Sequence, residues 1–114
     1  MGLINVLSSD ALGRVVKQVP FIEGAEVTFY GDVPGTFIQE MEQLQKDLGD
    51  REAGYAITVK TIADWNFADE KGEKLAIEAG NLKRLPVKLQ KWMFETSTAT
   101  LLPDSAKKKE LPAN

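Results

Sequence analysis

The sequence predicts an α+β fold that is mainly α, with a short N-terminal β element followed by a small helical bundle and a mobile C-terminal tail. Residues 25–30 alternate between apolar and polar side chains, which is the period of a half-buried strand. Over residues 37–93, apolar residues recur every three or four positions, which indicates amphipathic helices. From Ser97 the periodicity is lost, and prolines and a lysine run appear. We therefore expect one globular domain over residues 1–96 and a flexible tail over residues 97–114.

The segment before residue 25 permits two interpretations. A helix capped by Ser9 or Asp10 would end at Pro20, and its apolar side would carry Leu12, Val15, Val16 and Val19. Alternatively, residues 17–21 form a strand that pairs with residues 25–30 across a Glu-Gly turn. The pattern leaves both open, and such a strand could pair within one chain or between two chains. An exposed strand edge here would support assembly.

The central region predicts two helices joined by a Gly-Asp turn at residues 49–50. Thr36 begins a capping box, so we expect the first helix over residues 37–48. The second helix should end near Asp64. Its β-branched residues weaken the prediction, but their spacing favours helix over strand. So short a connection predicts an antiparallel helical hairpin.

The stretch of residues 62–77 joins the two halves of the chain. We expect Trp65 and Phe67 to point inward, residues 69–72 to form an exposed charged turn, and residues 75–77 to return to the core.

Two more helices are expected beyond this stretch, over residues 78–84 and 86–96. Pro86 separates them because proline disfavours a helical conformation at the preceding residue and suits the first turn of a new helix. One apolar seam runs through both helices and comprises Leu82, Leu85, Leu89, Trp92 and Met93.

The composition removes several kinds of chemistry. The chain has no cysteine and no histidine, which excludes disulfides, thiolate nucleophiles and histidine-based acid–base or metal sites. The net charge of −3 argues against general nucleic-acid binding, and Lys107 to Lys109 are too few for more than weak phosphate contacts. No secretory signal and no membrane-spanning run is recognisable, so we expect the interior of the cell.

Acidic residues beside aromatic residues are the remaining candidates for a site. Asp64 and Asp69 suit capping and turn formation better than acid–base catalysis. The spacing from Asp64 to Asn66 begins like a calcium loop, but Ala68 occupies the third ligand position and Asp69 the glycine position. We therefore expect no metal, no cofactor and no catalytic residue.

Trp65, Phe67 and Trp92 have two possible roles. Large aromatic side chains usually anchor a core, where each buries roughly 150–250 Å². They are also favoured at protein–protein contacts. The sequence alone leaves both roles open.

Residues 62–89 contain the pattern Ile62-x-Asp64-Trp65-Asn66-Phe67-x-Asp69-Glu70-x-Gly72-x-x-Leu75-x-Ile77, followed by Leu82-x-x-Leu85-Pro86-x-x-Leu89. This pattern resembles one in small proteins from the tail-gene clusters of long-tailed bacteriophages, which include the tail assembly chaperones. The similarity extends over about residues 20–95 and departs from the pattern at residues 76–79, where a helix start rich in Pro or Thr is more usual.

This resemblance implies a non-enzymatic morphogenesis factor in the cytoplasm of the bacterial host. Such chaperones coat the long helical tape measure protein, keep it soluble and give way to tail tube subunits, and they tend to self-associate. Amphipathic helices over residues 37–48 and 86–96 could present apolar grooves to such a partner. The candidate partner-binding residues are Phe37, Met41, Leu44, Trp65, Phe67, Leu89, Trp92 and Met93.

Three alternatives have less support. The chain could be a structural virion component, such as a small tail or head–tail connector subunit. A regulator that binds nucleic acid conflicts with the acidic balance, and an enzyme conflicts with the missing residue types. We therefore expect the tape measure protein, the tail tube protein and further copies of the chain as partners, and neither nucleic acid nor membrane.

Overall fold

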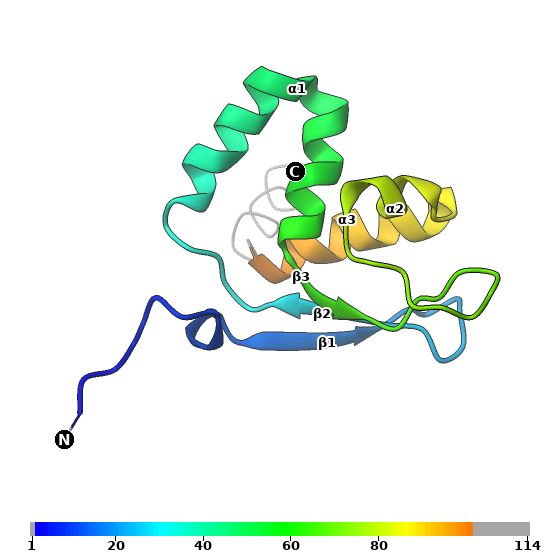
Figure 1. The fold of residues 1–114 in the computed structure, drawn as a ribbon, viewed down its shortest axis with the longest axis horizontal. Helices are drawn as coiled ribbons and strands as arrows, with labels where there is room; N and C mark the ends of the chain where they lie inside the picture. The colour runs from blue at the N-terminus through cyan, green and yellow to red at the C-terminus, as the bar shows by residue number, and fades with distance from the viewer. Residues whose placement is uncertain (1, 102–114) are drawn as a thin grey trace, which may run out of the picture.

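The computed structural model describes residues 2–101 and has the predicted α+β fold, which is mainly helical. Figure 1 shows the helices gathered on one side of a small sheet. The elements in chain order are the 3-10 helix η1 (Ser9–Leu12), β1 (Arg14–Gln18), β2 (Glu26–Tyr30), α1 (Phe37–Lys60), β3 (Ile62–Trp65), α2 (Ala79–Arg84) and α3 (Val87–Leu101).

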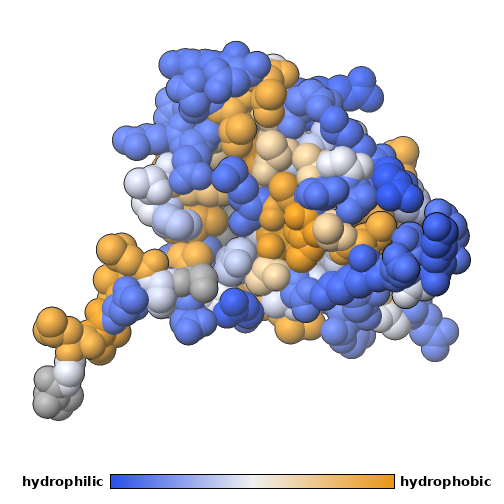
Figure 2. All heavy atoms as spheres, viewed as in Figure 1, coloured by the Kyte–Doolittle hydropathy of each residue, from blue (hydrophilic) through white to orange (hydrophobic). Residues whose placement is uncertain are grey.

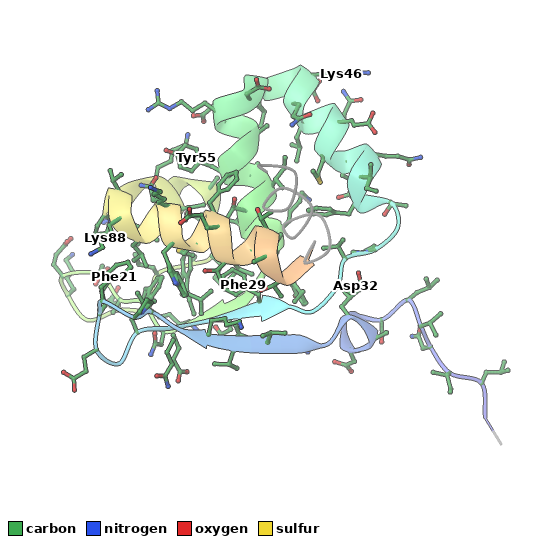
Figure 3. The ribbon with its side chains drawn as sticks, turned by 180° about the vertical axis from the view of Figure 1, so that it is seen from behind. Phe21, Phe29, Asp32, Lys46, Tyr55 and Lys88 are labelled. Carbon is green, nitrogen blue, oxygen red and sulfur yellow. The ribbon has the colours of Figure 1, made fainter. Side chains whose placement is uncertain are left out.

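The sheet is three-stranded and antiparallel, in the order β1-β2-β3. Val27 and Phe29 of β2 are completely buried in one cluster with residues of α2 and α3, and Figure 3 shows Phe29 on the side of the sheet that faces the helices. Thr28 lies between them in the strand and therefore points to the opposite face, where Val16 and Asp64 are its neighbours in the register. One face of the sheet thus forms the floor of the core, while the other carries exposed side chains.

The prediction of a helix between Ser9 and Pro20 is wrong, and the alternative prediction of a strand is closer to the structure. A single 3-10 turn ends at Gly13, whose φ of 73° breaks the helical path. The strand then runs over Arg14–Gln18 and pairs with β2 of the same chain. Val15 opposes the buried Phe29, whereas Val16 opposes Thr28 on the outer face. Two adjacent valines are compatible with either structure, because they share one broad side of a helix but point to opposite faces of a strand, which explains the ambiguity.

The prediction that the second central helix continues to Asp64 is also wrong, because α1 ends at Lys60 and residues 62–65 form β3. The register is irregular: Thr28 pairs with Asp64, but the next residue, Phe29, pairs with Ile62. The extra residue in β3 places Ile62 and Trp65 on the same buried face, although they are three positions apart. A spacing of three is typical of helices, and here a bulge produces it.

The two central helices are confirmed as two segments of α1 that meet at Gly49, a residue with φ 81° and ψ 164°. Figure 1 shows the segments as the arms of an inverted V. The chain reverses its direction as expected, but the arms diverge instead of packing along their length. In the first arm, Phe37 is buried, whereas Ile38 and Leu48 are exposed.

The stretch of residues 62–77 has the expected arrangement. Trp65 is buried, stacks on Phe67 at a centroid distance of 5.1 Å, and donates a hydrogen bond from Nε1 to the Leu75 carbonyl at 2.8 Å. The Asp69 carboxylate accepts the backbone N–H groups of residues 71 and 73, which closes the charged turn around Gly72. Asn66 bonds the backbone of residues 24 and 26, and so ties β3 to the β1–β2 turn.

Helix α3 is longer than predicted, because it continues past residue 96 to Leu101. Ser97 is buried, and its hydroxyl donates to Thr61 Oγ1 at 2.8 Å. Thr61 in turn donates to the Thr58 carbonyl at 2.6 Å. The folded part therefore includes residues 97–101, where the tail was expected to begin. The rest of the predicted tail, residues 102–114, lies outside the described part of the chain.

The core lies between the inner face of the sheet and the helices. Its buried hydrophobic cluster comprises Val19, Val27, Phe29, Ile62, Trp65, Leu82, Leu89 and Met93. Within residues 2–101, no helix combines the length and the apolar character needed to cross a membrane.

Candidate partner-binding groove

The most promising site is a groove between the second arm of α1 and the helices α2 and α3. Its volume is about 480 Å³, within the range of pockets that hold small ligands or side chains. Figure 3 shows Tyr55 on the second arm of α1, beside these two helices. The groove is lined by Asp50, Arg51, Gly54, Tyr55, Thr58, Leu82, Val87, Gln90, Lys91, Phe94 and Glu95.

Two apolar side chains of α3 stand open to solvent in this groove. Val87 is 80% exposed and Phe94 is 53% exposed. Gly54 lies opposite Phe94, and a Cβ added to Gly54 would stand 3.4 Å from Phe94 Cε2. The glycine therefore lets α1 approach the aromatic ring while leaving the ring partly uncovered. A partner that covered these two side chains would gain hydrophobic free energy.

Two uncharged polar side chains of the groove donate hydrogen bonds within the chain. Thr58 Oγ1 donates to the Gly54 carbonyl at 2.7 Å, and Gln90 Nε2 donates to the carbonyls of Lys83 and Leu85. The Gln90 bonds hold the end of α2 against the start of α3. The donor groups of Thr58 and Gln90 therefore serve the fold of the groove.

Charged residues of both signs surround the apolar centre. Asp50 and Glu95 are acidic, and Arg51 and Lys91 are basic. Lys83 of α2 pairs with Glu52, and its ammonium group lies 5.6 Å from the centroid of the Tyr55 ring. An apolar centre within a charged margin of nearly balanced sign suits a segment that is apolar and carries little net charge.

None of the eight partner-binding residues predicted from the sequence lines this groove. Trp65, Leu89 and Met93 belong to the core, and Phe37, the first residue of α1, is also buried. Each of these four side chains is at most 7% exposed.

The other four predicted residues are half-buried and do not share one site. Met41 and Leu44 lie on the first arm of α1, Phe67 packs on Trp65, and Trp92 packs on Phe29 at a centroid distance of 6.2 Å. Trp65 therefore anchors the core. Phe67 and Trp92 do so only in part, because each is half-buried.

A weaker pattern in the sequence points to the groove. Val87 and Phe94 are seven residues apart, so they share one side of α3. That side differs from the seam of Leu89 and Met93, which is buried. A second apolar stripe beside the core stripe indicates a helix with more apolar surface than its own domain covers. Gly54 and Tyr55 gave no such indication, because their role depends on how α1 packs against α3.

The acidic residues near the aromatic pair have structural partners. Asp64 lies on the outer face of the sheet and pairs with Lys74 Nζ at 2.6 Å. That hydrogen bond, with help from the Trp65 backbone, lowers the pKa of Asp64 below its ordinary value. The Asp69 carboxylate accepts hydrogen bonds from two backbone N–H groups of the turn that it begins. Among residues 2–101, no group of three or more acidic side chains is placed to hold a metal ion.

Comparison with protein-family models, with curated proteins and with solved structures finds no match for this chain.

Proposed function

We propose that the chain is a tail assembly chaperone of a long-tailed bacteriophage, which acts in the host cytoplasm and holds apolar helical segments of the tape measure protein. The resemblance of residues 62–89 supports the phage origin. The observation that carries the binding role is the groove in which Val87 and Phe94 remain exposed beside Gly54.

The dimensions of the groove favour a short apolar segment over a flat surface. Residues 87–95 span about 12 Å along the axis of α3, since a helix rises 1.5 Å per residue. A client helix of two to three turns could therefore place one or two large apolar side chains against Phe94. Each site would bind weakly, and many copies along a long client would supply avidity.

Co-expression tests this proposal directly. The chain should raise the soluble fraction of the tape measure protein, and the double variant Val87→Glu/Phe94→Glu should lose that effect. Both positions are exposed and glutamate is a good helix former, so the variant should stay folded. Ile38→Glu is the matched control, because Ile38 is an exposed helical residue outside the groove.

Two results would count against the proposal. A tape measure protein that is no more soluble with the unaltered chain would exclude the chaperone role. If mature virions also contained the chain, the structural-component alternative would take its place. Solubilisation that survives the double variant but fails in Ile38→Glu would move the client site to the first arm of α1.

A further inference from the structure

The N-terminal residues form an apolar arm that the rest of the described chain leaves uncovered. Leu3, Ile4, Val6 and Leu7 are 104%, 85%, 69% and 94% exposed, respectively. Figure 2 shows this arm as an apolar projection from the body of the molecule. Exposed apolar side chains are common singly, but four within five residues mark a segment that is built to be covered.

The arm is close to the domain only at its base. Asn5 forms a local turn, in which its side-chain oxygen accepts the Leu7 N–H at 3.0 Å. The chain then enters η1, and Gly13 is anchored to Gly31 by a backbone hydrogen bond of 3.0 Å. Before that anchor, residues 2–7 extend away from the body.

We propose that the arm of one copy docks in the groove between α1 and α3 of a second copy. Within residues 2–101, the arm presents apolar side chains that the other residues do not cover, and the groove presents the exposed Val87 and Phe94. Residues 3–7 in extended form span about 13 Å, at 3.3 Å per residue. This length matches the stretch of α3 from Val87 to Glu95, about 12 Å.

Charge also favours this pairing. The arm residues 2–8 carry no charged side chain, so they meet no net repulsion at a margin made of Asp50, Glu95, Arg51 and Lys91. The hollow nearest the base of the arm, lined by Leu12 and Phe37, also contains Asp32 and the Lys60–Glu40 ion pair. That hollow has a volume of about 230 Å³, about half that of the groove, and is therefore a poorer match for several apolar side chains.

The position of the arm favours a second copy over the arm's own groove. In Figure 3 the arm leaves the end of the molecule opposite to Phe21 and Lys88. Lys88 adjoins Val87, where the groove begins, and stacks over Phe21 at 4.6 Å. The arm therefore points away from that end of its own groove.

An arm placed in a neighbour's groove is a head-to-tail contact, in which the two surfaces differ. Each copy then still has one free arm or one free groove, so association continues until a ring closes or an open array forms. In such an array a neighbour's arm fills every groove except the one at the free end, so a client helix would compete with the arm for the groove. This inference goes beyond the proposed client binding and does not depend on which client binds.

The test is sedimentation equilibrium of the purified full chain with no client present. The unaltered chain should show a mass that rises with concentration above the 12.6 kDa of one copy. The arm variant Leu3→Ser/Leu7→Ser and the groove variant Val87→Glu/Phe94→Glu should each weaken association by about 30-fold or more, as loss of a hot-spot contact does. Ile38→Glu is the control and should associate like the unaltered chain.

Mixing the two variants distinguishes this arrangement from other kinds of association. The arm variant keeps its groove and the groove variant keeps its arm, so the mixture should form a complex of two copies and nothing larger. A chain that stays at the mass of one copy at all concentrations would overturn the proposal, and so would arm and groove variants that associate as the unaltered chain does. Because no tape measure protein is present, these results are independent of the proposed client.

Discussion

The strongest test of the fold is the substitution Trp65→Ala. Trp65 is 2% exposed, stacks on Phe67 and donates a hydrogen bond to the Leu75 carbonyl at 2.8 Å. Truncating a buried tryptophan to alanine costs about 3–5 kcal/mol. A domain of this size has a free energy of unfolding of about 5–15 kcal/mol. The substitution should therefore remove between a fifth and nearly all of the stability.

Trp65→Phe separates the two contributions of this side chain. It keeps a ring in the core but leaves the Leu75 carbonyl without its donor, and we expect a loss of about 1–2 kcal/mol. Urea unfolding followed by far-ultraviolet circular dichroism measures both losses, provided that the slope with urea is unchanged. Val87→Ala serves as the control, because Val87 is 80% exposed and its loss should stay within about 0.5 kcal/mol.

A loss of less than about 1 kcal/mol in the free energy of unfolding of Trp65→Ala would refute the reasoning, because removing a buried ring destabilises a core by more than that. Equal losses in Trp65→Ala and Trp65→Phe would be a different contradiction. They would mean that the hydrogen bond, and not the packing of the ring, holds residues 62–77 in place.

Three further substitutions test the turns and the sheet. Asp69→Ala removes the acceptor of two backbone N–H groups and should lower the free energy of unfolding by about 1–2 kcal/mol, whereas Asp69→Asn should cost less. Gly49→Ala forces a side chain onto a backbone with φ 81° and ψ 164°, and urea unfolding should show a loss of about 1–3 kcal/mol. Asp64→Asn concerns acid stability. The lowered pKa of Asp64 means that the stabilisation from Lys74 is complete above the ordinary pKa of an aspartate and is lost as the pH falls through the lowered value. The urea midpoint of the unaltered chain should therefore fall more steeply on acidification than that of Asp64→Asn, and parallel curves would exclude this contribution.

Local patterns were sufficient where one rule governs a segment. The alternation of residues 25–30 predicted β2, and the spacing after Thr36 predicted the first arm of α1. The stretch of residues 62–77 was predicted to form an aromatic anchor followed by a charged turn, and it does so because Trp65 and Asp69 bond to backbone groups close in sequence.

Local patterns were insufficient where a partner far along the chain decides the structure. β3 depends on its pairing with β2, and the bulge in that pairing gives Ile62 and Trp65 a helix-like spacing. The end of α3 depends on the bond between Ser97 and Thr61. The groove depends on Gly54 facing Phe94 across two helices. Such contacts join residues more than thirty positions apart, and no window of the sequence contains both members.

The sequence pattern of residues 62–89 and the exposed side chains of the groove involve different residues. The motif residues make the scaffold: Trp65 bonds to Leu75, and Leu82 and Leu89 pack in the core. Val87 occupies one of the unspecified positions after Pro86, and Phe94 lies beyond the motif.

Leu82 both lines the groove and belongs to the core, but the exposed side chains of the groove, Val87 and Phe94, are separate from those that hold the fold. Because exposed positions contribute little to folding stability, Val87 and Phe94 can change while the scaffold persists. Under the proposed function, the choice of partner should follow residues 87 and 94. Exchanging these two residues for smaller apolar ones should change which apolar segments bind while leaving the urea midpoint in place.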